Sequence, residues 1–300
     1  MKPWLLLLAG CSSGCSLFPA DEPDVAGTLT IRVATLHLDQ RADWSRRRPL
    51  LEAGLAAISA DVVAFQDVLS FPDATDQVDW IHRRLGFQVR FQETGVPFGS
   101  ARTGLAVASR YPILETATLA VDHGGRRLTL VQTVLVETPL GSLGIHNARL
   151  PESLDEIDRL HAIRSILAHM SGMHSDLAPI LLGSFGLVPE APALAVLTAA
   201  TDGTAPCFDV WRATRGYEPG PTVDLFEPSS HDSRRRARRV DYIFLAREAG
   251  LRPGLPVSAD RFCDTPDPFG TWPGSHSGLT ATLKYRRRAK SADPAGTPPP

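Results

Sequence analysis

The sequence predicts an α/β domain in which two β-sheets pack together and helices lie outside them. Apolar segments of strand type alternate with segments of helical period along the chain. Strands and helices interleave throughout and no segment is repeated, a pattern that favours packed sheets flanked by helices. The stretch 28–285 is also long enough for one large domain rather than two small ones.

In the first half of the domain, alternating or short apolar runs predict strands, and a period of 3.6 residues predicts helices. The expected strands are 28–38, 61–68 and 104–109, followed by a hairpin of 127–136 and 142–148. The expected helices are 49–60 and 76–85, the second with Gly86 as its stop.

In the second half, the strongest helix is expected to start at Ser153, because Ser153 and Glu156 form a capping box. Its predicted apolar face consists of Ile157, Leu160, Ile163, Leu167 and Met170. The remaining expected elements are a buried strand 179–182, a helix 191–200, and the last strands 240–245 and 278–283.

The two ends of the chain lie outside the predicted domain. Residues 1–10 carry one lysine and a short apolar run, which is typical of a secretory signal and too short to span a bilayer. The string Leu8-Ala9-Gly10-Cys11 resembles a bacterial lipobox, which implies lipidation of the Cys11 thiol. Residues 11–27 have the composition of a tether, and 286–300 that of a disordered tail.

This leader predicts a protein anchored in the bacterial cell envelope, at the outer membrane or the periplasmic face, and we expect that protein to be a monomer. The membrane is the expected partner, because several buried acyl carbons on Cys11 would hold the protein there. The alternative is an ordinary cleaved signal in which the cysteine has no role. The formal net charge of −2 gives no general attraction for nucleic acid.

Several segments resemble, in the same order, the motifs of the endonuclease/exonuclease/phosphatase family. Gly104–Ile113 matches a structural strand of that family, and Arg239–Phe244 and Gly274–Leu279 match its closing strand and loop. The resemblance covers residues 28–285 and implies the DNase I-like fold, a four-layer α/β sandwich of two mainly antiparallel sheets flanked by helices. It also implies phosphoester hydrolysis that depends on a divalent metal, Mg²⁺ or Mn²⁺.

The resemblance assigns a base dyad and a metal site to four residues. Asp241 and His276 match the dyad, in which a carboxylate orients the imidazole that activates water. Asp67 stands at the metal carboxylate of the family, and Asp39 where some members carry a second acidic residue. The alternative for Asp241 and His276 is a structural pair, since a buried carboxylate needs a partner.

Other positions depart from the family pattern. His37 replaces an asparagine, Arg149 a histidine, and Ser184 and Gly186 the polar residues of Gly-Asp-Phe-Asn. Ser275 likewise replaces the aspartate that precedes the dyad histidine. Ser184 cannot take a proton at neutral pH, and groups that act as a unit lose orders of magnitude in rate when several are removed.

The substituted residues have open interpretations. His37, Arg149 and Ser184 are candidate ligands of a substrate or another anion. His37 also suits a softer ion such as Zn²⁺, or a hydrogen bond in the core. Arg149 can instead take the place of the lost metal and pair with Asp67, and Ser184 can be a small polar filler.

Two functions remain open at this stage. The first is an envelope lipoprotein that keeps the cleft of the family, has little or no hydrolytic activity, and binds an anionic ligand. The second is an active phosphodiesterase or phosphatase, acting on a nuclease-type or phospholipid-type substrate, with a rebuilt metal site that uses Asp67, Asp39, His37 and the Asp241/His276 dyad.

Two further features have alternative interpretations. The arginine-rich run Ser233–Arg239 can draw anionic lipid or nucleic acid toward the site, or form a solvated loop. No aromatic residues interleave with it, which weakens the nucleic-acid interpretation. Cys207 and Cys263 can pair in an oxidising compartment or remain two separate buried thiols.

Overall fold

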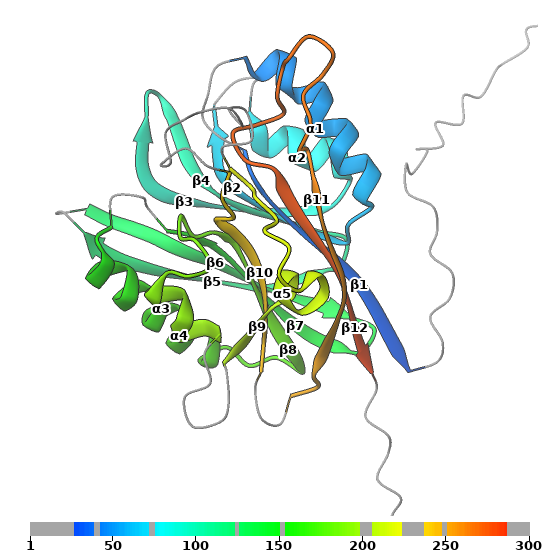
Figure 1. The fold of residues 1–300 in the computed structure, drawn as a ribbon, viewed down its shortest axis with the longest axis vertical. Coiled ribbons are helices and arrows are strands. Elements are labelled where there is room, and N and C mark those ends of the chain that lie inside the picture. Colours follow the sequence, from blue (N-terminus) through cyan, green and yellow to red (C-terminus); the bar gives the residue numbers. More distant parts are fainter. Residues whose placement is uncertain are drawn as a thin grey trace, which may run out of the picture.

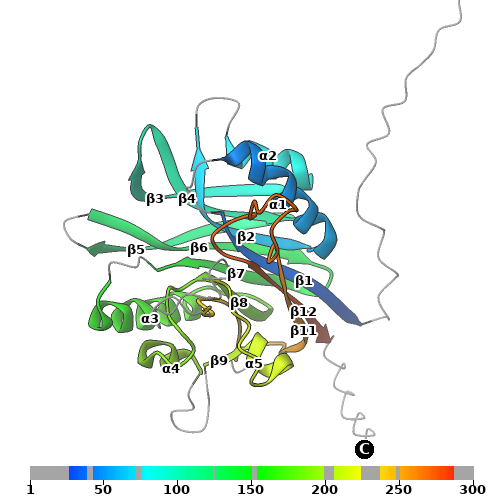
Figure 2. The ribbon, with the colours of Figure 1, turned by 45° about the horizontal axis from the view of Figure 1, so that its top comes forward.

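Two six-stranded β-sheets pack face to face, and helices lie on the outer side of each sheet (Figure 1). The helices α1 (Trp44–Ile58) and α2 (Gln77–Leu85) lie beyond one sheet, and α3 (Glu156–Ser171) and α4 (Pro192–Thr198) beyond the other. Figure 2 shows these layers from the side. The arrangement confirms the predicted two-sheet α/β sandwich.

The computed structural model describes residues 27–38, 43–71, 76–123, 126–150, 154–198, 206–223, 237–247 and 251–286. Outside these ranges lie the leader with Cys11, nearly all of the expected tether and of the expected tail, Asp39, Ser153 and most of the arginine-rich run. No helix in the described ranges is both long enough and apolar enough to cross a membrane.

The first sheet brings together strands from both ends of the domain. Its strands are β1 (Thr28–His37), β2 (Val62–Ser70), β3 (Gln88–Phe98), β4 (Ala101–Ser109), β11 (Gly254–Phe262) and β12 (Gly278–Arg286), in the order β11-β12-β1-β2-β4-β3. β1 runs parallel to β2, with His37 opposite Gln66, and antiparallel to β12, with Thr35 opposite Leu279. The C-terminal ends of β1 and β2 and the start of β12 therefore lie on the same side of this sheet.

The second sheet is built from the middle of the chain. Its strands are β5 (Ile113–His123), β6 (Arg126–Thr138), β7 (Gly141–Arg149), β8 (Leu177–Ser184), β9 (Cys207–Asp209) and β10 (Asp241–Ala246), in the order β5-β6-β7-β8-β10-β9. Ser184 lies opposite Arg149 in the parallel β7–β8 pair and opposite Asp241 in the antiparallel β8–β10 pair. These three polar residues are therefore neighbours where the strands β7 and β8 end and β10 begins.

Three hydrophobic clusters hold the layers together. One lies between the two sheets and draws residues from both, among them Ile31, Val107 and Ile180. The second joins the second sheet to α3 and α4, and the third joins the first sheet to α1 and α2. Because both faces of each sheet are covered, a central strand such as β8 is buried at every position.

Two predicted helices start at other residues than expected. α1 begins at Trp44, so that Pro49 lies inside it rather than at its first position. α3 begins at Glu156 with Asp155 as its cap, since the Asp155 carboxylate accepts from the backbone N–H of Asp158. The predicted capping box is therefore wrong, and so is part of the predicted apolar face, because Ile157 is 67% exposed.

The strands that the sequence analysis missed are the edge strands of the two sheets: β3, β5, β9 and β11. An edge strand is covered less completely than a central one, so its sequence need not show a continuous apolar run. β11 also contains a proline and a change of register between Pro256 and Ser258. The sequence analysis therefore predicted the central strands of both sheets and missed the edge strands.

The two cysteines of the domain are free thiols. Cys207 is buried in the cluster beneath α3 and α4, whereas Cys263 packs against the cluster beneath α1 and α2. Burial raises the pKa of both thiols to about 12. Of the two interpretations, the structure shows two separate thiols.

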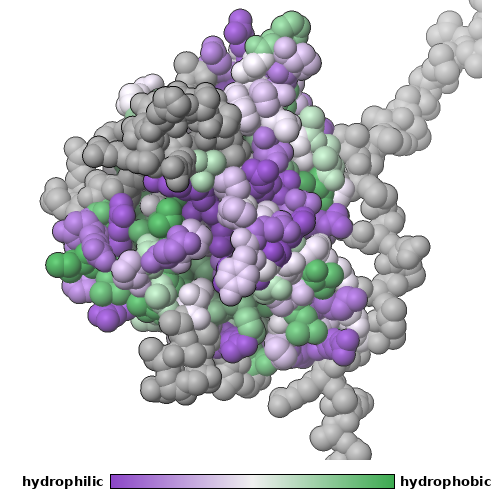
Figure 3. Space-filling view, in the orientation of Figure 1, coloured by the Kyte–Doolittle hydropathy of each residue, from purple (hydrophilic) through white to green (hydrophobic). Residues whose placement is uncertain are grey.

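Large exposed apolar side chains are scattered over the described surface. On the face drawn in Figure 3, hydrophilic residues gather toward the middle and apolar residues form separate patches. The exposed large apolar residues are Val96, Phe98, Leu114, Ile157, Tyr217, Leu255, Val257 and Phe269. They belong to several elements of both sheets and to loops.

Candidate functional site

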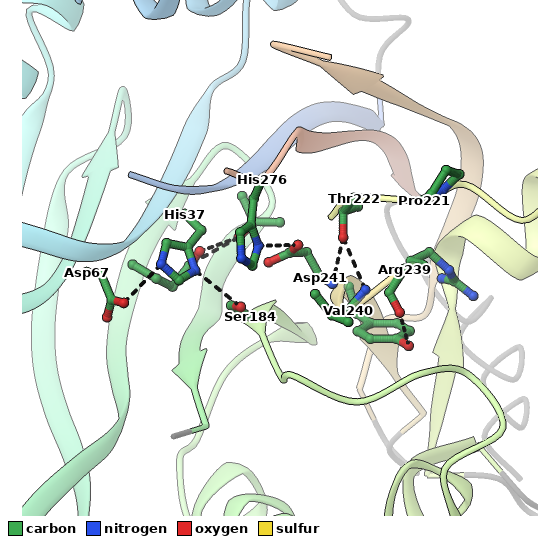
Figure 4. A network of polar contacts seen from close by, with 12 residues as sticks. His37, Asp67, Ser184, Pro221, Thr222, Arg239, Val240, Asp241 and His276 are labelled. Atoms are coloured by element: carbon green, nitrogen blue, oxygen red, sulfur yellow. Dashed lines mark hydrogen bonds and ion pairs between the residues drawn. The ribbon is translucent and has the colours of Figure 1, made fainter. Parts of the chain in front are cut away.

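A cluster of polar side chains lies where strand ends of the two sheets meet (Figure 4). The first sheet supplies one residue at the end of β1, one in β2 and one just before β12. The second sheet supplies residues at the ends of β7 and β8 and at the start of β10. The members of this cluster are His37, Asp67, Arg149, Ser184, Asp241 and His276.

Asp241 and His276 form a close hydrogen-bonded pair. His276 Nδ1 lies 2.8 Å from Asp241 Oδ2, and the two residues are 9% and 2% exposed. Burial alone raises the pKa of Asp241, but the neighbouring His276 and its hydrogen bond outweigh burial and lower it. Asp241 is therefore ionised and accepts the Nδ1–H of His276.

The start of β10 is fixed by a threonine. The Thr222 hydroxyl oxygen accepts from the backbone N–H groups of Val240 at 3.1 Å and Asp241 at 3.3 Å. The backbone N–H of Ser277 in turn donates to the carbonyl of Thr222 at 2.8 Å. One short segment therefore positions both members of the pair.

Asp67 lies at an irregularity in β2. The pairing of β2 with β4 changes register between Phe65 and Val68, and Asp67 has a φ of 51°. A non-glycine residue in this left-handed region costs about 1–3 kcal/mol, a strain that is found most often at functional sites. The bulge directs the Asp67 side chain into the cluster, as β-bulges commonly do beside active sites.

Asp67 is held by a histidine and by an arginine. His37 Nε2 lies 2.9 Å from Asp67 Oδ2, and Arg149 places Nε 3.3 Å from Oδ1 and Nη2 3.3 Å from Oδ2. Arg149 Nη1 donates to the carbonyl of Leu150. Although burial raises the pKa of Asp67, these two partners hold it well below its usual range. The contact predicted between Arg149 and Asp67 is thus present.

His37 connects the two halves of the cluster. Its Nδ1 lies 3.4 Å from Ser184 Oγ, and its ring centroid lies 4.1 Å from that of His276. Burial, followed by the neighbouring His276, lowers the pKa of His37. The neutral ring donates from Nε2 to the ionised Asp67, which leaves the Nδ1 lone pair on the side of Ser184.

Two supports of the site escaped the sequence analysis. The buried Arg47 of α1 donates to the carbonyls of Leu38 and Pro273, and so ties the segment after His37 to the loop before His276. Beneath the cluster, Gln66 Nε2 donates to Asn147 Oδ1 at 2.7 Å. Gln66 directly precedes the predicted ligand Asp67 in the sequence, but nothing in the sequence around Arg47 indicated this role.

The Mg²⁺ or Mn²⁺ ion that the resemblance implies does not fit the residues around Asp67. Such ions need several oxygen ligands in near-octahedral geometry. In the described chain Asp67 is the one carboxylate at this position, and Arg149 contacts both of its oxygens. The second predicted ligand, Asp39, lies outside the described residues.

A different group of residues has the composition of a metal site. His37, Asp241 and His276 each offer one ligand atom, and these atoms lie within 4.8 Å of one another. The structure therefore contains a possible metal site, formed by two imidazoles and one carboxylate. It is displaced from the Asp67–Arg149 contact and includes the predicted dyad.

Comparisons with known proteins place this arrangement in a known fold. No protein-family model matches the chain. No curated protein matches it either. D. rerio TDP2 complexed with single strand DNA product is similar in structure, with a TM-score of 0.66 at 17% identity over 85% of this chain and 98% of that chain.

Two bacterial structures give the same result. An endonuclease/exonuclease/phosphatase from Beutenbergia cavernae has a TM-score of 0.61 at 19% identity and covers 88% of this chain and 73% of that chain. A family protein from Leptotrichia buccalis has a TM-score of 0.63 at 16% identity and covers 84% and 98%. The chain therefore has the DNase I-like fold of endonuclease/exonuclease/phosphatase proteins, as the sequence motifs predicted.

Proposed function

We propose that this chain is a cell-envelope protein whose DNase I-like domain has lost Mg²⁺-dependent phosphoester hydrolysis. The contact between Arg149 and Asp67 carries the proposal, because a permanent positive charge lies on both oxygens of the expected metal ligand. Metal-assisted hydrolysis needs an ion that can bind both the protein and a phosphoryl oxygen. A guanidinium held by Asp67 and Leu150 leaves no room for that arrangement.

The substitutions at the end of β8 support the same proposal. Ser184 faces His37 rather than offering a carboxylate for the attacking water. Gly186 has a φ of 63° and has no side chain to hydrogen-bond a phosphate. Without these groups the Asp241–His276 pair lacks the partners with which a base acts on water.

The alternative function, metal-dependent hydrolysis, is supported by the geometry of the predicted dyad. The dyad geometry is intact, with His276 held at 2.8 Å by an ionised Asp241. D. rerio TDP2, which has this fold, is described in complex with single strand DNA product. The alternative is therefore a metal-dependent phosphodiesterase acting on nucleic acid or phospholipid through a rebuilt metal site.

A hydrolysis assay separates the two functions. The full chain and its His276→Ala variant are incubated with bis(p-nitrophenyl) phosphate or single-stranded DNA, together with Mg²⁺, Mn²⁺ or Zn²⁺. We expect equal background release from both proteins with every ion. Turnover that requires an ion and disappears in His276→Ala would establish the alternative instead.

The envelope location rests on the leader sequence. The Leu8-Ala9-Gly10-Cys11 string predicts an acylated mature N-terminus. Expression in a bacterial host with labelled palmitate is expected to label the unaltered chain and not Cys11→Ser. Equal labelling, or a soluble periplasmic product from both, would contradict the anchor and leave the proposal about hydrolysis unaffected.

The anionic ligand expected from the sequence stays a prediction. Arg149 is the one guanidinium among the six residues of the cluster, and it is engaged with Asp67. The cluster also contains two carboxylates, Asp67 and Asp241, and these repel an anion. The described cluster alone therefore favours a cation over an anion.

A further inference from the structure

We propose that His37, His276 and Asp241 bind a divalent transition-metal ion of the Zn²⁺ type. The ion lies beside the dyad and not at Asp67, the position where the resemblance implies Mg²⁺. The proposal goes beyond the loss of Mg²⁺-dependent hydrolysis and does not depend on it. Its basis is the donor set, an unsatisfied carboxylate oxygen and the orientation of His37.

The donor set selects the class of ion. Two imidazole nitrogens and one carboxylate oxygen suit Zn²⁺ and its neighbours, whereas Mg²⁺ requires mainly oxygen. Ligands at about 2.0–2.2 Å on a tetrahedral ion lie about 3.3 Å apart. The three ligand atoms are within 4.8 Å of one another. Metal binding therefore requires the three ligand atoms to move closer together than they lie in this structure.

One oxygen of Asp241 supplies an independent observation. Oδ2 accepts from His276, but Oδ1 is buried and has no hydrogen-bond partner among the described residues. Thr222 helps to lower the pKa of this carboxyl, yet its hydroxyl makes no hydrogen bond to Oδ1. An unsatisfied buried polar atom costs about 1–3 kcal/mol. A bound cation would satisfy this oxygen directly.

The partners of His37 prepare it as a ligand. Asp67 accepts the Nε2–H at 2.9 Å, and this contact fixes the tautomer whose lone pair is on Nδ1. Arg149 in turn fixes Asp67, so Asp67 and Arg149 orient the histidine without touching the ion. The centroid of the neighbouring His276 ring lies 4.1 Å from that of His37 (Figure 4).

A site with three protein ligands has a consequence for other ligands. Zinc sites of this kind commonly keep a fourth position for water or for a bound molecule. The ion would add positive charge beside the two carboxylates of the cluster. An anionic ligand, if the protein binds one, would then attach through the ion rather than through Arg149.

Calorimetry with Zn²⁺ and absorption with Co²⁺ test the site directly. The full chain in detergent is titrated alongside His37→Ala, His276→Ala and the isosteric Asp241→Asn. His161→Ala is the matched control, because His161 lies exposed on α3. We expect one ion per chain and visible Co²⁺ d–d bands for the unaltered chain and the control. The three variants should bind at least about 10–100-fold more weakly.

Two outcomes would overturn the proposal: no saturable Zn²⁺ binding by the unaltered chain, or binding by the three variants that is as tight as that of the unaltered chain. Zn²⁺ should also raise the melting temperature of the unaltered chain and not that of Asp241→Asn, whose circular dichroism reports whether it is folded. The Zn²⁺ proposal and the proposed loss of hydrolysis are tested separately. Mg²⁺-dependent turnover would contradict the loss of hydrolysis, whereas absence of Zn²⁺ binding would contradict only the Zn²⁺ site.

Discussion

Asp67 and Asp241 each hold a buried histidine at hydrogen-bonding distance, 2.9 and 2.8 Å away, but their other contacts differ. Arg149 contacts both oxygens of Asp67, whereas one oxygen of Asp241 has no partner among the described residues. A permanently charged guanidinium contacts the first carboxylate, whereas His276 is the side chain that hydrogen-bonds the second in the described cluster. We therefore expect the two aspartate–histidine pairs to differ in their capacity to bind a cation. The difference comes from Arg149, which contacts the first pair and not the second.

The largest effect is expected from removing the guanidinium. Arg149→Ala leaves Asp67 with His37 as its remaining partner in the described cluster, and we expect a loss of about 3 kcal/mol in the free energy of unfolding. Arg83→Ala is the control, because the Arg83–Asp79 pair on α2 is 63% and 68% exposed. That substitution should cost about 0.5 kcal/mol or less. Urea denaturation measures both, and equal losses would show that Arg149 does not neutralise a buried charge.

The pH dependence of stability should come partly from His37. Its folded pKa is lowered, so below about pH 6.5 the unfolded chain binds the additional proton. This part of the stability is complete above that pH and is lost as the pH falls toward the folded pKa. Between pH 6.5 and 4.5 it amounts to at most about 2.7 kcal/mol.

His37→Gln should reduce the slope of unfolding free energy against pH in this window, while His161→Gln should leave it unchanged. His146, whose pKa burial lowers to about 3, acts in the same direction in all three proteins and cancels in the comparison. An unchanged slope in His37→Gln would indicate that His37 is charged beside Asp67.

A metal ion should partly replace the missing guanidinium. In Arg149→Ala the Asp67 carboxylate becomes accessible to Mn²⁺, which at ten times its Kd adds about 1.4 kcal/mol of stability. The unaltered chain should gain less from the same ion, and thermal melting with and without Mn²⁺ measures the difference. Equal gains in the two proteins would mean that Arg149 does not compete with metal at Asp67.

The smallest effect is expected at Ser184. Its hydroxyl lies 3.4 Å from His37 Nδ1, a long hydrogen bond, so Ser184→Ala should cost about 0.5 kcal/mol. Urea denaturation should also show that Zn²⁺ stabilises this variant as it does the unaltered chain. A loss of several kcal/mol would make Ser184 a structural link between the two pairs rather than a filler.

The central strands and their polar ends could be predicted from the sequence. β8 and β10 are buried apolar runs, and the order of the motifs around Asp67, Arg149, Ser184 and Asp241 matched a known fold. The edge strands β3, β5, β9 and β11 were missed because partial exposure removes the apolar signal. The cap of α3 was misplaced because aspartate and serine are both good capping residues, so that the sequence offered both Ser153 and Asp155.

The six residues of the cluster could be named from the sequence, but their arrangement in space could not. The contact of Arg149 with Asp67 was one of two interpretations that the sequence left open, the other being an anion ligand. The stacking of His37 on His276 was not predicted, because it depends on how two sheets meet across the core. Likewise, no local pattern shows that Arg47 holds the segments beside both histidines.

Titration of Mg²⁺ into the full chain, followed by calorimetry, tests most directly whether Arg149 has taken the place of the metal at Asp67. Asp67→Asn and Asp241→Asn serve as paired variants, since each removes one carboxylate with little change in shape. We predict no saturable Mg²⁺ binding by the unaltered chain. Binding of one Mg²⁺ that is kept in Asp241→Asn and lost in Asp67→Asn would contradict this prediction.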